Sequence, residues 1–401
     1  PVTIDEALRA RRQRLDKRSR AILERAAVIG EVFWDEAVLA LTRGSEGAQE
    51  KKEPAQIWPD DSETMTLEAT LKRLEEAEFV VPLEGSEFSR VREYAFRHAG
   101  LRDQIYADIA PKSLELNHRL AAQWFDAKEP ALRAQFLEQI ADHWERAGDR
   151  KRAAVVLIEA AGLAKARSVN QKAIKLYERG LLSLSDDDRL LRMEALHDLG
   201  SVYELTGDLE SAMERLTDML RDSWVLVERG KAGAALNKLG RIHRSRGDYP
   251  AARAYLQRGL QLFRAADDIR GVASSLDDLG NLYWLLGHYQ RALDHSAEAL
   301  EIRRSVSDRR GESIALLNIG HIEMARGFLS EADACYREAL DIARSLGDRD
   351  AECKALNSIG SVLHTHGSMQ EAIDLWRSAL TIAEEVGDRR LESFLLNNLG
   401  E

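Results

Sequence analysis

Residues 96–103 read FRHAGLRD and place His98 between Arg97 and Arg102. An imidazole in such a segment can act as a general base, bind a metal, contact a phosphate oxygen or serve packing. Catalysis and metal binding require partner residues, yet the sequence contains no GxxxxGK[ST], HExxH, CxxC or GxSxG motif, and its ten histidines lack ligand-like spacing. We therefore expect no catalytic residue, no metal site and no enzymatic activity. A packing or capping residue and a phosphate sensor remain as the two interpretations of His98.

Charge and composition limit the class of protein further. The 401 residues are 44% hydrophobic and 31% charged, with a formal net charge of −11. Such a balance is typical of a globular, helix-rich chain, and its negative charge disfavours direct binding to nucleic acid or anionic membranes. No apolar run approaches the roughly 20 residues that span a bilayer. The two cysteines, Cys335 and Cys353, are too few for a disulfide framework, so we expect a cytoplasmic protein.

Small residues recur with a period of forty residues in the second half of the chain. A first series of glycines is followed after seven residues by a second series, and an alanine follows each of the latter after five. The positions are Gly200, Gly240, Gly280, Gly320, Gly360 and Gly400, then Gly207, Gly247, Gly287, Gly327 and Gly367, and then Ala212, Ala252, Ala292, Ala332 and Ala372. A strict period of this length predicts a solenoid of helical hairpins.

Each unit has the pattern of two helices, which we name A and B, joined by a Gly-Asp break. The first glycine and the alanine are small and allow the two helices to cross closely. The second glycine ends helix A with a positive φ. Asp248 can cap the following helix B, and Pro250 fits its first turn. This pattern resembles the tetratricopeptide repeat (TPR). The resemblance implies five units of forty residues and a truncated sixth over 189–401, wound as a right-handed α-solenoid.

The segment 111–188 has the same helical pattern with irregular spacing, and we interpret it as entry repeats. The sequence stops at Glu401, midway through a helix A. An end of this kind would expose the apolar face of the last repeat, so we expect a longer natural protein.

Residues 1–110 follow a different plan. Apolar spacing predicts helices over 3–15, 18–30, 34–42 and 65–79, a mobile loop over 43–63 and a β-hairpin over 80–96. Helices followed by a two-stranded wing indicate a small winged-helix domain. The helix 65–79 carries more acidic than basic residues, which opposes DNA phosphates, so we do not expect DNA binding there.

Two phrases in this region, RAAVIGEVFWDEAVLAL and YAFRHAGLRDQIY, resemble the winged helix of signal-transduction ATPases with numerous domains (STAND). Such segments occur in bacterial multidomain kinases, nucleotide cyclases and transcription regulators, where repeats follow. The resemblance implies that His98 contacts the diphosphate of bound ADP, although Ala99 stands where the family has an acidic residue. Because this chain lacks a phosphate-binding loop, it needs no cofactor of its own, and ADP or ATP could bind only together with an NTPase domain.

Positions 5, 9 and 12 of each helix A, counted so that the first glycine is position 8, should line the inner surface of the solenoid. We expect an asparagine at position 5 to hold the backbone of an extended peptide, and the arginines and apolar residues to form a mixed groove. The candidate binding residues are Asn237, Arg241, Arg244, Asp277, Asn281, Trp284, Leu317, His321, Met324, Asn357, Ser361, His364 and Asn397.

These features favour a non-catalytic protein-interaction and signal-sensing module of a bacterial STAND-type regulator. A protein or peptide would bind the repeats, and the winged helix would relay that event to an ATPase or effector domain elsewhere in the protein. Two alternatives remain: a stand-alone TPR scaffold that bridges proteins, and the regulatory arm of a transcription factor.

Overall fold

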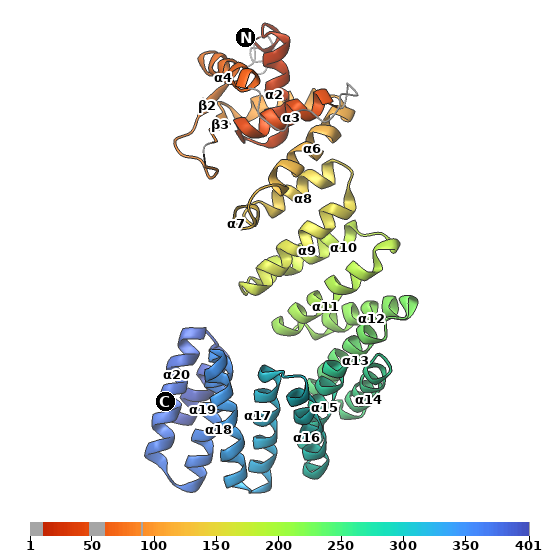
Figure 1. Cartoon of the computed structure of the whole chain (residues 1–401), viewed down its shortest axis with the longest axis vertical. Coiled ribbons are helices and arrows are strands. Elements are labelled where there is room, and N and C mark those ends of the chain that lie inside the picture. The colour runs from red at the N-terminus through yellow and green to blue at the C-terminus, as the bar shows by residue number, and fades with distance from the viewer. Residues whose placement is uncertain (1–10, 48–60, 90, 401) are drawn as a thin grey trace. The chain divides into compact units, whose positions relative to one another are not determined.

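The computed structural model describes residues 11–47, 61–89 and 91–400 (Figure 1). The chain divides into two compact units, Pro1–Ala195 and Leu196–Glu401. The boundary falls inside one helix, α11 (Arg189–Thr206), and each unit is described by itself.

Within its described residues, the first unit begins with four helices and a small antiparallel sheet of order β1-β3-β2. Asp16 caps the first of these helices by accepting a hydrogen bond from the Ser19 amide at 2.8 Å. The elements are α2 (Lys17–Ile29), β1 (Val32–Trp34), α3 (Asp35–Gly47), α4 (Asp61–Glu76), β2 (Val80–Pro82), β3 (Glu93–Phe96) and α5 (Ala99–Ala107).

Three details of this region differ from the sequence prediction. The strand β1 pairs with β3, so the expected two-stranded hairpin is part of a three-stranded sheet, and Trp34 belongs to a strand. Residues 43–47 continue α3 and 61–63 begin α4, so the predicted loop 43–63 is wrong at both ends. Its centre, 48–60, and most of the predicted helix 3–15 lie outside the described residues. A strand of three residues is too short to give an alternating pattern that distinguishes it from a helix boundary.

The rest of the first unit consists of α6 (Pro111–Asp126), α7 (Pro130–Arg133), α8 (Leu137–Arg146), α9 (Arg150–Ala166), α10 (Asn170–Ser183) and a 3-10 turn η1 (Asp186–Asp188). An aromatic cluster joins these helices to the sheet. Trp34 of β1 packs against Trp124 and Phe125 of α6, with ring centroids 5.8 and 5.6 Å away. Phe88, which lies between β2 and β3, stacks on Phe136 at 5.3 Å.

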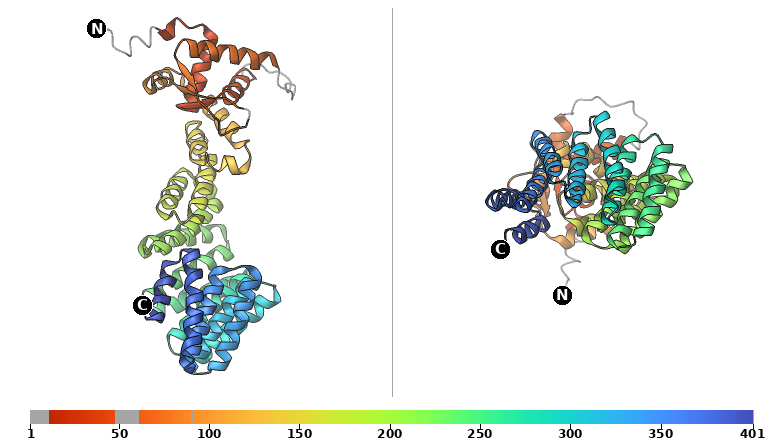
Figure 2. Two further views of the ribbon diagram at one scale, coloured as in Figure 1. Left: turned by 90° about the vertical axis from the view of Figure 1, so that its left-hand side faces the viewer. Right: turned by 90° about the horizontal axis from the view of Figure 1, so that it is seen from below.

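The second unit is a series of antiparallel helix pairs followed by a single helix. The right view in Figure 2 shows successive pairs side by side in sequence order, from green to blue. After α11 the helices are α12 (Leu209–Leu226), α13 (Arg229–Ser245), α14 (Tyr249–Ala265), α15 (Ile269–Leu285), α16 (Tyr289–Ser305), α17 (Arg309–Arg326), α18 (Leu329–Leu346), α19 (Arg349–His366), α20 (Met369–Val386) and α21 (Arg389–Leu399).

The two glycine series have the roles that their spacing predicts. A Cβ at Gly240 would lie 2.7 Å from Leu256, and one at Gly360 would lie 2.6 Å from Trp376, so the first series permits close crossing of helices A and B. The second series adopts positive φ, between 72° and 89°, at every unit. Asp248 accepts from the Ala251 amide at 3.2 Å and caps α14, as expected.

Each pair buries its repeated alanine fully, and the side chain opposite its first glycine varies along the array, in the order Leu216, Leu256, Ser296, Tyr336 and Trp376. Tyr336 is fully buried and Trp376 nearly so. Helix periodicity therefore identified this core correctly.

Candidate binding surface on the A helices

Contacts between successive A helices show that they lie side by side along one face. The residue at position 9 of one unit contacts position 6 of the next, thirty-seven residues later. The pairs are Ser201 with Lys238, Arg241 with Asp278 at 3.4 Å, and His321 with Ser358 at 3.2 Å. We call this surface, made by positions 5, 9 and 12 of α13, α15, α17, α19 and α21, the A-helix face.

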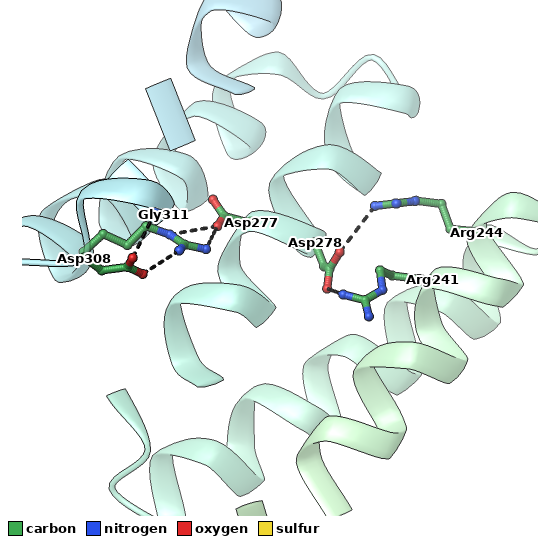
Figure 3. A network of polar contacts seen from close by, with 7 residues as sticks. Arg241, Arg244, Asp277, Asp278, Asp308 and Gly311 are labelled. Atoms are coloured by element: carbon green, nitrogen blue, oxygen red, sulfur yellow. Dashed lines mark hydrogen bonds and ion pairs between the residues drawn. The ribbon is translucent and has the colours of Figure 1, made fainter. Parts of the chain in front are cut away.

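In α13 and α15 this face is occupied by ion pairs (Figure 3). Asp278 is buried and lies 3.4 Å from the Arg241 guanidinium and 3.7 Å from that of Arg244. Its neighbour Asp277 is also buried and pairs with Arg303 of α16. Burial raises the pKa of Asp277 to about 6, against the opposing effect of the Arg303 charge.

Arg303 continues this network to the next repeat. Its Nη1 lies 3.0 Å from Asp308, and Asp308 caps α17 by accepting from the Gly311 amide at 3.0 Å. The network therefore links three consecutive units. The expected cationic end, Arg241 and Arg244, contacts Asp278 within the fold, so its contact with a ligand stays a prediction, as does that of Asp277.

The asparagines at position 5 differ from one another. Asn237 is 3% exposed and accepts a hydrogen bond from Ser275 at 3.0 Å, so it cannot hold a peptide backbone, contrary to expectation. Asn357 is half-buried and its Oδ1 accepts from Asn398 at 2.9 Å. Asn397 is exposed on α21.

The remaining candidates form the open part of the A-helix face, from α15 to α21. Trp284 is 36% exposed, and His321 and His364 are exposed one and two repeats later. Asn281, Met324 and Ser361 are half-buried between them. Leu317 is 7% exposed and belongs to the core. The expectation that Leu317 is a surface anchor is therefore wrong.

His98 lies directly before α5, at its N-cap position. Its side chain is exposed and makes no capping hydrogen bond, so neither packing nor capping accounts for it. Among the described residues, no group of three or more His, Cys, Asp or Glu side chains could hold a metal ion.

A buried histidine pair was missed in the sequence. Nδ1 of His118 (α6) lies 2.8 Å from Nδ1 of His143 (α8), and the Tyr106 hydroxyl (α5) lies 2.7 Å from Nε2 of His118. Burial lowers the pKa of His118 to about 3 and that of His143 to about 4, and the nearby charge of Arg146 acts in the same direction. Both rings are therefore neutral at physiological pH. Twenty-five residues separate the two histidines, so no local motif indicated the pair.

Comparison with known proteins agrees with this architecture. Residues 231–305 and 312–385 match the family model of the tetratricopeptide repeat, so this part of the chain consists of TPR units. No curated protein matches the sequence.

Two solved structures with similar folds cover most of the chain. The first is a STAND protein with a tetratricopeptide repeat sensor from Pyrococcus horikoshii, with TM-score 0.58 and 14% identity, covering 99% of this chain and 55% of that one. The second is aspartyl phosphate phosphatase F from Bacillus subtilis, with TM-score 0.52 and 12% identity, covering 91% and 94%. At these identities the likeness concerns the fold alone, and the chain spans about half the length of the STAND protein.

The fold and its surface thus define a TPR solenoid, a class of helical array suited to protein interaction. No enzyme family is indicated by the matches. No helix in the described part of the chain is long and apolar enough to cross a bilayer.

Proposed function

We propose that the chain is the sensing and interaction arm of a STAND-type signalling protein, and that it binds a protein or peptide segment along the open part of the A-helix face. The carrying observation is Trp284, a large aromatic side chain left 36% exposed where the preceding repeat uses its own inner positions for ion pairs. Exposed aromatic residues are frequent anchors of protein interfaces.

The ion-pair network supports this location. Because Arg241, Arg244, Asp277 and Asp278 are paired internally, a ligand at α13 would have to break buried charge contacts. His321, His364 and Asn397 are exposed on α17, α19 and α21 and lie outside this network, so a ligand that contacts them leaves these ion pairs intact.

The same proposal covers the N-terminal region. Its helices and three-stranded sheet would act as a winged helix that relays ligand binding to an ATPase domain, with His98 as the contact to ADP. The exposed side chain of His98 and the likeness of the whole fold to a STAND protein support this role.

Hydrogen–deuterium exchange tests the binding surface. Peptides selected from a random displayed library should slow exchange in α15, α17 and α19 when they bind the full chain. Protection confined to the B helices, such as α14 or α16, would contradict the proposal.

ADP release tests the relay. In a protein that includes the ATPase domain, His98→Ala should accelerate ADP release, whereas Arg20→Ala, on the exposed side of α2, should not. Unchanged ADP release in His98→Ala would rule out the sensor role.

A further inference from the structure

A cavity of about 520 Å³ lies between α2, α3 and α4 of the first unit. Its volume falls within the range of about 300–1,000 Å³ that is typical of small-molecule sites. Its lining combines basic, apolar and polar side chains: Lys17, Arg18 and Arg25; Ala21, Ile22, Leu39 and Leu67; Thr42 and Glu63.

Two of the cations that line the cavity are open to solvent. Lys17 and Arg18 are exposed, and neither forms an ion pair with any residue in the described parts of the chain. The single acidic residue of the lining, Glu63, is already paired with Arg43 at 2.8 Å. The chain as a whole carries a net charge of −11 and should repel anions. The positive charge at this cavity is therefore a local feature that can attract an anion.

Apolar side chains line the cavity beside these cations. Arg18, Ala21, Ile22 and Arg25 follow one another at helical spacing, so α2 presents cations and apolar side chains on a single face. Leu39 of α3 faces the same cavity and is half-buried, which leaves part of its side chain for a ligand.

We propose that this cavity binds a small organic anion, in which an acidic group is joined to a hydrophobic body. The acidic group would contact Lys17 and Arg18, and the body would pack on Ala21 and Leu39. A concave volume of this size, open to solvent on the side of Lys17 and Arg18, favours a small molecule over the flat surface of a folded protein.

Ligand-observed NMR on the full chain tests this site with three probes: naphthoate, its neutral analogue naphthalenemethanol, and inorganic phosphate. We expect naphthoate to bind saturably and about two- to fivefold more tightly than the neutral analogue, because Lys17 and Arg18 are exposed and water screens their contact with an anion. Phosphate should bind weakly, because it lacks the hydrophobic body.

Matched variants locate the site. The double variant Lys17→Glu with Arg18→Glu should weaken naphthoate by about tenfold or more. Arg20→Glu, exposed on the same helix but outside the cavity lining, should leave the affinity unchanged, and Leu39→Gln should weaken the neutral and anionic probes alike. Thermal unfolding would verify that each variant is folded.

Two results would overturn the proposal. Equal weakening by Arg20→Glu would show general attraction to a basic helix, and equal affinity for phosphate and naphthoate would show an anion contact without a hydrophobic site. An acidic peptide that competes with naphthoate, with an affinity lost in the double variant, would identify a protein ligand and contradict the small-molecule assignment.

Discussion

Asp277 and Asp278 are neighbours on α15, yet their carboxylates form ion pairs with two different helices (Figure 3). Asp277 pairs with Arg303 of α16, and Asp278 lies within 3.7 Å of both Arg241 and Arg244 of α13. The two residues thereby join α13, α15 and α16, and their ion pairs occupy the start of the A-helix face.

The raised pKa of Asp277 makes the stability of the repeats depend on pH. Its folded value of about 6 exceeds the ordinary 3.8, so between these values the folded chain holds a proton that the unfolded chain has released. The free energy of unfolding should therefore rise as pH falls through this window, by about 1.4 kcal/mol per pH unit from this group. Urea unfolding of Asp277→Asn between pH 4 and 7 should lack this component. Asp341→Asn, exposed on α18, is the control, and an equal loss in both variants would contradict the assignment.

The histidine pair, His118 and His143, should change the free energy of unfolding with pH in the opposite direction to Asp277. The folded pKa values of His118 and His143, about 3 and about 4, lie below the ordinary 6.5, so the unfolded chain binds protons first as pH falls. Stability should decline from about pH 6.5 downward, by about 1.4 kcal/mol per pH unit for each ring. Thermal unfolding of His118→Gln at pH 7 and pH 5 should show a smaller decline than the wild type. An identical decline would mean that the folded chain does not lower the pKa of His118.

A methyl group at Gly320 should disrupt the crossing of α17 and α18. It would overlap the ring of Tyr336, which is fully buried and has no room to move. Gly320→Ala should therefore lower the free energy of unfolding by about 1–3 kcal/mol despite the better helix propensity of alanine. Gly100→Ala, in α5 with no atom within 4 Å, should be neutral or slightly stabilising. Equal stability of the two variants in chemical denaturation would disprove the packing role.

Val227 adopts a left-handed conformation, φ 60°, at the end of α12. Gly347 and Gly387 occupy the equivalent position in later repeats with φ 65° and 75°. Because a β-branched residue is strained there and Val227 is 69% exposed, Val227→Gly should stabilise the chain by about 1 kcal/mol. Val225→Gly, inside the same helix, should destabilise it by about 0.5–1 kcal/mol. A loss of stability in Val227→Gly would show that its side chain makes a contact worth more than the strain.

The repeat architecture was predictable because its signal is local and repeated. In every repeat, the first glycine and the alanine mark the place where helices A and B cross. The structure places Gly240 against Leu256, as the spacing requires. The strand β1 was not predictable, since three apolar residues between two helices carry no period.

The occupancy of the A-helix face could be predicted only in part. Positions 5, 9 and 12 were identified from helical spacing, but whether a side chain there is free depends on the adjacent repeat. Arg241 is paired because Asp278 lies thirty-seven residues later, one helical turn short of the repeat period. That spacing is visible in the sequence. It predicts that Arg241 is paired with an acidic residue, and it predicts no such partner for Trp284. By contrast, the contact of His118 with His143 depends on irregular helices and has no such signal.

The affinity of a selected peptide for two tryptophan variants tests the central claim most directly. Trp284 is 36% exposed on the A-helix face, and Trp224 is 47% exposed on α12, a B helix. The proposal predicts that Trp284→Ala raises the Kd by about tenfold or more, as loss of an aromatic anchor does, while Trp224→Ala leaves it unchanged. An unchanged Kd in Trp284→Ala, or a larger effect of Trp224→Ala, would contradict binding on the open part of the A-helix face.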